Sequence, residues 1–243
     1  MRIKVIGVGG YGTEIAAKMS SENIPGTSFA AVDTDEDELE ASGLDEVLKI
    51  GENSPLGEGT GGRTDLGLRA AGGSSQKIND MVSDTDIVVL VCGLGGGTGT
   101  GAAPVIAKAA RENGAGVCAV VKNSFSFEGA QKSKNALDCI KSLKDNTDSF
   151  LVFDVKFYEG DAEVTHHPES FELSFSKTNI QKLTHKITLD DFFDLIYSEI
   201  FEFVKSLAES SDKECLKSLG NSFTGYTARQ NESIVYSVLG GLY

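Results

Sequence analysis

The stretch Cys92-Gly93-Leu94-Gly95-Gly96-Gly97-Thr98-Gly99-Thr100-Gly101 decides the fold of this chain. It follows an apolar run, Asp86–Cys92 (DIVVLVC), typical of a strand buried on both faces of a parallel sheet. Six glycines within Gly93–Gly101 cost conformational entropy when the loop is ordered, and packing gives little reason for them. The loop offers a row of N–H donors and two hydroxyls for a di- or triphosphate. We therefore expect alanine at both Gly97 and Gly99 to abolish phosphate binding.

A second glycine motif, Gly7-Val8-Gly9-Gly10-Tyr11-Gly12, ends the predicted strand Ile3–Val8 and precedes the predicted helix Tyr11–Ser21. It fits G-x-G-x-x-G, in which residues without Cβ let a helix N-terminus approach a phosphate. Asp33 follows about 20 residues later, where a dinucleotide-binding fold has its ribose-binding acid. Alone, this motif favours an NAD-dependent oxidoreductase, or a tight turn with no ligand.

A third glycine-rich loop, Gly57-Glu58-Gly59-Thr60-Gly61-Gly62, is expected to close over the same ligand. Phosphate-type loops at the carboxyl ends of strands in one sheet predict a single nucleotide at a topological switch point. The first two loops contain no Lys or Arg, so helix dipoles and a cation such as Mg²⁺ must neutralise the phosphates. Arg63 and Lys132 could assist from the rim, or could be solvated surface residues.

Strand and helix patterns alternate over the first 150 residues, which predicts an α/β fold: a Rossmann-like parallel sheet with helices on both faces. The pattern stops after Asp154, and Lys156–Lys186 is polar and irregular apart from one expected strand, Phe171–Phe175. A long helix with an apolar stripe follows at Leu189–Glu209. The other expected strands are Ser28–Val32, Val47–Ile50, Gly116–Val121, Phe150–Phe153, Ser222–Tyr226 and Ser233–Leu239, and the other expected helices are Glu36–Ala41, Thr64–Val82, Ala102–Arg111 and Gly129–Leu143.

Composition excludes several classes of function. The 243 residues carry 36 acidic and 22 basic side chains, a formal charge of −14, which argues against nucleic acid and anionic lipid as partners. No apolar run reaches the roughly 18 residues of a membrane-spanning helix. The four cysteines form no CxxC pair, and His166-His167 lacks a metal-ligand spacing, so we expect no protein-held metal cluster. Reduced core cysteines and the absence of a visible signal peptide predict a cytoplasmic protein.

The glycine signature Gly95–Gly101 resembles that of the tubulin/FtsZ superfamily, and the FtsZ branch is closer than tubulin. The resemblance covers about Met1 to Ser149 and resumes weakly over Ile187–Glu209. Its four blocks fall in the family's order: Ile3–Gly12 (IKVIGVGGYG), Ala31–Asp35 (AVDTD), Gly95–Pro104 (GGGTGTGAAP) and Phe125–Gly129 (FSFEG). It implies a GTP-binding domain over residues 1–186, a central helix over 187–211 and a short C-terminal extension over 212–243, in place of the family's second domain.

By this resemblance, Glu128 matches the family's ribose-binding acid, Lys132 stands where a nucleotide-contacting Arg is usual, and Phe193 matches the aromatic near the guanine. The residue patterns and the resemblance together give one set of candidate GTP- or GDP-binding residues: Gly9, Gly10, Tyr11, Gly12, Glu14, Asp33, Gly59, Gly61, Gly95, Gly96, Gly97, Thr98, Gly99, Thr100, Gly101, Glu128, Lys132, Phe193, Asp194 and Tyr197.

The sequence departs from the family in the first loop, at Asp33 and at the positions for base recognition. Tyr11 and Glu14 replace a Gly and an Asn of the first loop, and Asp33 replaces the commoner Asn. Tyr197 and Ser198 stand where the family has an Asn-Asp pair. Asp194, one helical turn earlier, is a possible substitute. These departures weaken the prediction of guanine specificity more than that of phosphate binding.

The catalytic loop departs furthest from the family pattern. In the family, an acidic loop of the form Asn-x-Asp-Phe-Ala-Asp enters the next subunit's site and positions water, but no such string follows Glu209. Asp212 and Glu214 lie near the right place and are the candidate catalytic residues, although two acids after a helix are more often a solvated end.

Three hypotheses of function follow. The first is an FtsZ-like GTPase that forms head-to-tail homopolymers, with slow or partner-dependent hydrolysis, acting with the proteins of a cell-division or membrane-remodelling system. The second is a nucleotide-binding scaffold without turnover. The third, least favoured because a dinucleotide site needs only one glycine loop, is the NAD-dependent oxidoreductase.

Overall fold

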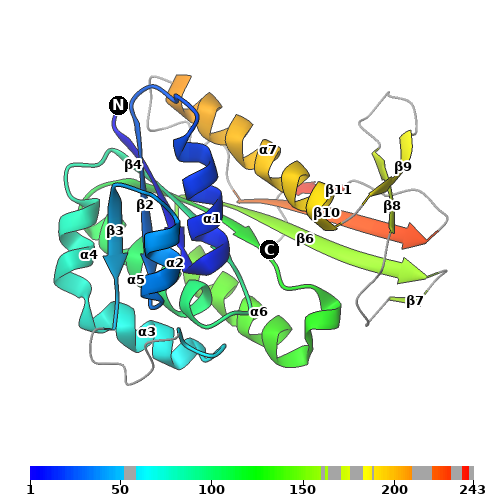
Figure 1. Cartoon of the computed structure of the whole chain (residues 1–243), viewed down its shortest axis with the longest axis horizontal. Coiled ribbons are helices and arrows are strands. Elements are labelled where there is room, and N and C mark those ends of the chain that lie inside the picture. Colours follow the sequence, from blue (N-terminus) through cyan, green and yellow to red (C-terminus); the bar gives the residue numbers. More distant parts are fainter. Residues whose placement is uncertain are drawn as a thin grey trace.

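Parallel strands form the centre of the computed structural model (Figure 1). The structure describes residues 1–51, 59–159, 162–163, 171–175, 183–187, 189–209, 221–230 and 237–240. Six strands run parallel in the spatial order β3-β2-β1-β4-β5-β6. Their bounds are β1 (Ile3–Val8), β2 (Thr27–Asp33), β3 (Glu46–Lys49), β4 (Ile87–Gly93), β5 (Gly116–Lys122) and β6 (Ser149–Glu159). The strand order reverses between β1 and β4, which makes that point the topological switch of the sheet.

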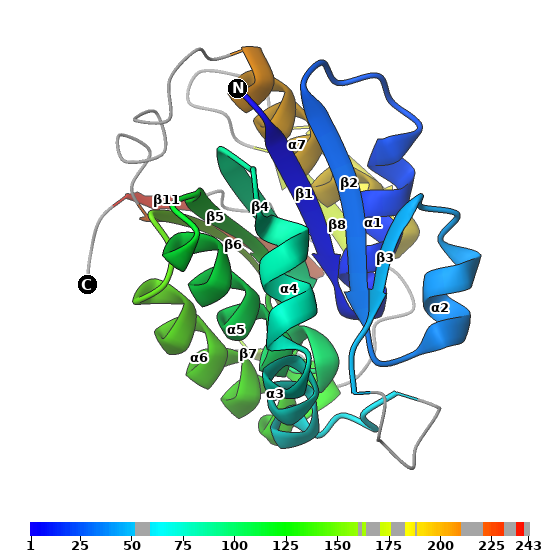
Figure 2. The same cartoon turned by 90° about the vertical axis from the view of Figure 1, so that its left-hand side faces the viewer.

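Helices cover both faces of this sheet, which confirms the predicted fold class (Figure 2). One face packs against α3 (Thr64–Gly73), α4 (Ser75–Val82), α5 (Thr98–Glu112) and α6 (Ala130–Lys144). The other face packs against α1 (Gly9–Ser20) and α7 (Leu189–Glu209), while α2 (Glu36–Ala41) lies beside β2 and β3. Among the side chains of α7 that the structure describes, Ile196, Ile200, Val204 and Leu207 are buried, and all four belong to the apolar stripe seen in the sequence.

The predicted helix Thr64–Val82 is wrong in one respect, because the structure has two helices there. The chain leaves helical geometry at Ser74, where φ is −106° and ψ is 17°, directly after Gly72-Gly73. Adjacent glycines lower helix stability by about 1 kcal/mol each relative to alanine, so the break falls where the sequence tolerates it.

The irregular segment predicted at Lys156–Lys186 also needs correction. Strand β6 continues to Glu159, because β10 (Asn221–Gln230) pairs with it in parallel along ten residues. The same segment contains β7 (Ala162–Glu163) and β8 (Phe171–Phe175), and β8 pairs with β9 (Leu183–Ile187). The expected strand at Phe171–Phe175 is confirmed. The predicted C-terminal extension therefore adds β10 and its antiparallel neighbour β11 (Ser237–Gly240) to the main sheet.

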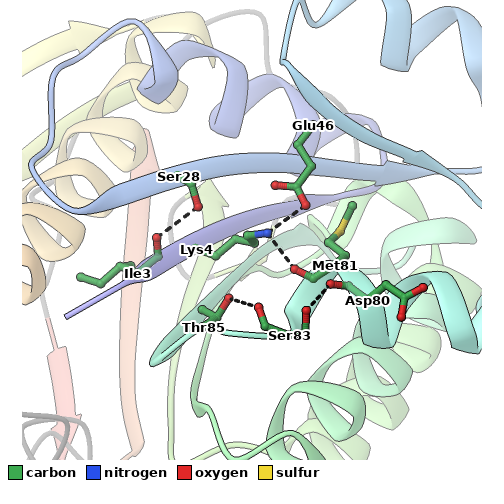
Figure 3. Close-up of polar contacts among 8 residues, drawn as sticks. All are labelled: Ile3, Lys4, Ser28, Glu46, Asp80, Met81, Ser83 and Thr85. Carbon is green, nitrogen blue, oxygen red and sulfur yellow. Dashed lines mark hydrogen bonds and ion pairs between the residues drawn. The ribbon is translucent and has the colours of Figure 1, made fainter.

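A polar contact ties the amino ends of the strands together (Figure 3). The part-buried Lys4 Nζ on β1 donates to Glu46 Oε1 on β3 at 2.8 Å and to the Met81 carbonyl on α4 at 2.7 Å. Met81 lies in the last turn of α4, where carbonyl groups lack hydrogen-bond partners within the helix. The Lys4 ammonium therefore supplies a donor to one of these carbonyl groups. This contact lies at the opposite end of the sheet from the glycine loops, which follow the carboxyl ends of β1 and β4.

Candidate functional site

The two glycine motifs become the first turns of two helices. Helix α1 begins at Gly9 and α5 begins at Thr98, which is earlier than the predicted starts at Tyr11 and Ala102. Gly9 has a φ of +74°, and a Cβ there would lie 2.8 Å from the Gly99 nitrogen. The two helix N-termini therefore meet backbone to backbone at the switch point, at a separation that no larger residue permits at these positions.

Neither helix N-terminus is capped by the side chain of its own N-cap residue. The N-cap positions Val8 and Gly97 make no side-chain capping hydrogen bond, and neither first turn contains an acidic residue. The N-terminus of α2 differs, because Asp35 accepts hydrogen bonds there from the N–H groups of Asp37 and Glu38. Uncapped N–H groups and two helix dipoles aimed at one point make a site for an anion.

A cavity of about 330 Å³ lies at this point. Its wall is formed by residues at the β1–α1, β2–α2 and β4–α5 connections. The segment before α3 and the end of β5 with the loop after it also contribute. The lining residues are Val8, Gly9, Gly10, Tyr11, Asp33, Asp35, Glu38, Gly59, Thr60, Gly93, Leu94, Gly96, Gly97, Thr98, Gly99, Lys122, Glu128 and Lys132. The structure thus brings eleven of the predicted binding residues together: Gly9, Gly10, Tyr11, Asp33, Gly59, Gly96, Gly97, Thr98, Gly99, Glu128 and Lys132.

Several predicted glycines outside this lining are explained by packing, contrary to the expectation from sequence. A Cβ on Gly12 would lie 2.1 Å from the Val91 carbonyl oxygen, and one on Gly101 would lie 2.3 Å from that of Thr64. These glycines let α1 approach β4 and let α5 approach α3. The Gly95 N–H donates to Thr100 Oγ1 at 2.8 Å, and this hydrogen bond holds the turn before α5. Gly61 also lies outside the cavity lining.

Acidic and hydroxyl groups gather on the β2–α2 side of the cavity. Asp33 Oδ1 accepts from the Thr34 N–H at 2.6 Å and from the Asp35 N–H at 3.2 Å, and burial raises the pKa of Asp33 despite these bonds. Burial, and then the charges of Asp33 and Asp35, raise the pKa of Glu38. The Thr34 and Thr98 hydroxyls lie 2.8 Å apart, which joins this side to α5.

This donor set fits a hard cation such as Mg²⁺, which usually combines one or two carboxylates with phosphate oxygens. The described residues contain no group of three or more His, Cys, Asp or Glu side chains that could hold a metal alone. A cation there would be completed by ligand oxygens, and it would relieve the repulsion among Asp33, Asp35 and Glu38.

The opposite side of the cavity, after β5, carries its positive charge. Lys132 Nζ donates to Glu128 Oε1 at 2.8 Å, and the Phe125 N–H donates to Glu128 Oε2 at 2.7 Å. Burial opposes ionisation of Glu128, but these bonds and the charge of Lys122 outweigh it and lower the pKa. Sequence reasoning missed Lys122, although a lysine ending an otherwise apolar parallel strand was the signal, because ligands bind beyond the carboxyl ends of such strands.

The residues predicted to recognise the base lie outside this cavity. Phe193 packs against Tyr11 and Phe125, with ring centroids 6.1 Å away in each case. Asp194 accepts from Lys18 Nζ at 2.6 Å, and that ammonium lies 4.2 Å from the centre of the Tyr197 ring. Glu14 lines a neighbouring cavity of about 530 Å³ between α1 and α2. The predicted catalytic residues Asp212 and Glu214, and His166-His167, lie outside the described residues.

Comparison with known proteins places this geometry in a family. The GTPase domain of the Tubulin/FtsZ family matches residues 2–157, more than half of the 243-residue chain. The chain belongs to the Tubulin/FtsZ family. It is 42% identical over 151 residues to cell division protein FtsZ of Aquifex aeolicus, and 38% identical over 151 residues to FtsZ 1 of Methanocaldococcus jannaschii. Each match covers 62% of this chain but only 41% or 42% of the relative, so this FtsZ-like chain spans about two fifths of their length.

Solved structures agree with this assignment. An empty FtsZ dimer from M. jannaschii superposes with a TM-score of 0.71 at 28% identity, over 93% of this chain and 63% of that one. CetZ2 of Haloferax volcanii, described as a GTPgS-bound protofilament, gives a TM-score of 0.70 over 93% of this chain and 66% of that one. At 23% identity, the second likeness shows the fold alone. In the ranges that the structure describes, no helix of this FtsZ-like chain is long and apolar enough to cross a bilayer.

Proposed function

We propose that this FtsZ-like chain binds GTP or GDP in the glycine-lined cavity and assembles head to tail with further copies of itself. The observation that carries the proposal is the meeting of two uncapped helix N-termini, those of α1 and α5, at the switch point of the sheet. Membership of a family described by its GTPase domain supports guanine nucleotide as the ligand.

Each side of the cavity has a part in this proposal. The first turns of α1 and α5 bind the phosphates, and Asp35 and Glu38 would hold a Mg²⁺ ion that neutralises phosphate charge. Glu128, fixed by two hydrogen bonds, accepts from the ribose hydroxyls, and Lys132 orients Glu128. Phe193, Asp194, Tyr197 and Glu14 form the base side of the proposed site. Tyr197 and Ser198 stand in place of the family's Asn-Asp pair, so base recognition has to use different side chains.

Hydrolysis is proposed to be slow and to depend on a neighbouring copy or a partner. Asp212 or Glu214 of one copy would position water at the nucleotide of the next. We propose cell division or membrane remodelling as the cellular setting, because the curated relatives are named as cell division proteins. The decisive experiment is phosphate release from GTP at increasing protein concentration, with sedimentation of polymer in the same samples. Release per molecule that rises steeply with concentration, together with pelleting, supports a polymerising GTPase.

A non-hydrolysing scaffold is the second candidate, and one observation favours it. The sequence after Glu209 lacks the acidic string that completes hydrolysis in the family. A scaffold would bind GTP and pellet, yet release no phosphate at any concentration. Turnover that stays constant per molecule at every concentration, with no pelleting, would contradict both forms of head-to-tail assembly.

A further inference from the structure

Lys122 is a buried ammonium at the end of β5 that faces the cavity. Alternate residues of β5 point to opposite faces, and Lys122 shares its face with Cys118 and Val120, which pack in the core beneath α1 and α7. Its exposed fraction is only 9%, yet it lines the cavity between the α1 loop and Glu128. A lysine this deeply buried is rare unless it is paired.

Aromatic rings surround the Lys122 ammonium in place of an anion. The Nζ atom lies 3.9 Å from the ring centre of Phe125, 5.5 Å from that of Phe193 and 5.8 Å from that of Tyr11. Within the described residues, the nearby carboxylate of Glu128 bonds to Lys132 and to the Phe125 N–H instead of forming an ion pair with Lys122. The rings orient the ammonium but do not neutralise it, so among the described side chains the Lys122 charge has no ion-pair partner.

We propose that Lys122 binds a phosphate group of the nucleotide and supplies the positive charge that the two glycine loops lack. This inference rests on the proposed function and adds a specific binding residue to it. An anion is the ligand that completes the site, because both helix N-termini and the ammonium line the same cavity and each favours negative charge there. The phosphates are the only anionic part of a nucleotide. Lys132 is the other cation in the cavity wall, and its charge is already matched by Glu128.

In the nucleotide-free protein, burial of the charged Lys122 ammonium costs free energy, and a bound anion would remove that cost. Burial, the largest effect, lowers the pKa of Lys122 to about 8, with Glu128 opposing the shift and Lys132 adding to it. In the part of the chain that the structure describes, Tyr11 on α1 also faces the ammonium, and burial raises the pKa of Tyr11, so it stays neutral. On α7, Asp194 follows Phe193 in the sequence and accepts a hydrogen bond from Lys18. An anion binds the protonated lysine, so affinity should hold below pH 8 and fall above it.

The test compares three proteins by calorimetric titration with GTP and with inorganic tripolyphosphate, each at pH 7 and pH 9. Lys122→Met keeps the length and apolar stem of the side chain, and Lys134→Met removes the same charge from an exposed position on α6. At pH 7, Lys122→Met should lower the affinity for both ligands about 10- to 100-fold, as expected for loss of a charged hydrogen bond. Lys134→Met should bind both ligands with wild-type affinity. The Tm of free Lys122→Met should rise, which separates lost binding from lost folding.

The pH arm isolates the ammonium from the nucleotide's own titrations, which all three proteins share. Between pH 7 and pH 9, wild-type affinity should fall about tenfold more than that of Lys122→Met, because the lysine is one pH unit past a pKa of about 8. Equal affinities of Lys122→Met and wild type at pH 7, or the same pH dependence in both, would overturn the inference. If tripolyphosphate binds and its binding needs Lys122, but GTP does not bind, the proposed function is contradicted while the role of Lys122 in binding phosphate stands. Failure of the wild type to bind either ligand would contradict both.

Discussion

Gly99→Ala tests whether the two glycine loops pack against each other or only line a ligand site. A Cβ on Gly99 would lie 2.7 Å from the Gly93 carbonyl oxygen and 3.1 Å from the Val8 carbonyl oxygen. Both contacts are to backbone at the carboxyl ends of β4 and β1, so the clash cannot be relieved by a side-chain rotation. Overpacking of this kind costs about 1–3 kcal/mol.

For a chain of this size, that cost lowers Tm by about 2–12 °C, because 1 kcal/mol shifts Tm by about 2–4 °C. The measurement is thermal unfolding by circular dichroism of the nucleotide-free protein. Gly72→Ala is the matched control, since a Cβ there meets no atom within 4 Å and alanine favours the α3 helix. We expect Gly72→Ala to unfold at the wild-type temperature or above. A Gly99→Ala protein as stable as the wild type would refute the close packing of the first turn of α5 against the carboxyl ends of β4 and β1.

Three further predictions rest on the structure and a fourth rests on the sequence. Gly96→Ala should leave Tm unchanged, because its Cβ meets no atom within 4 Å, but should weaken GTP binding several-fold in a calorimetric titration; unchanged affinity would remove Gly96 from the site. Asp33→Asn should raise the urea midpoint of unfolding at pH 7, because the raised pKa of buried Asp33 makes its ionisation costly in the folded state. This gain in stability should vanish near pH 3, where Asp33 is protonated in both the folded and the unfolded state. A gain that persists at pH 3 would contradict this cause. Lys4→Met should cost about 1–2 kcal/mol in urea unfolding while leaving nucleotide affinity intact, since Lys4 lies at the far end of the sheet; a change in affinity would contradict that separation. Asp212→Ala or Glu214→Ala should lower GTP turnover without lowering GTP affinity, and parental rates in both variants would exclude these acids from catalysis.

The sheet and the glycine-lined cavity at its switch point could be predicted because their signals are local. Apolar runs ended by glycine give β1 and β4, and the alternation of strands with helices gives the parallel arrangement. The helix starts could not be placed from the sequence, because Gly9 and Thr98–Gly101 are helical only through their contacts with α5, α3 and the sheet. Glycine propensity alone favours a loop at these positions.

Lys122 and the length of β6 depend on contacts between distant segments, which no local pattern reports. Lys122 becomes a buried cation only when α1, α7 and the loop after β5 converge on the end of its strand. Strand β6 reaches Glu159 because β10, more than sixty residues later, pairs with it. Gly12 and Gly101 show that a glycine in such a motif can also be needed for close packing between elements, which the sequence alone does not reveal.

The most direct test of the account is a calorimetric titration of the nucleotide-free protein with GTP, with ATP and NADH as controls. The account predicts tight binding of GTP, weaker binding of ATP and none of NADH. Equal affinity for GTP and ATP would retain the phosphate site but contradict guanine specificity. Binding of NADH without GTP would contradict the central claim that the paired helix N-termini form a GTP site.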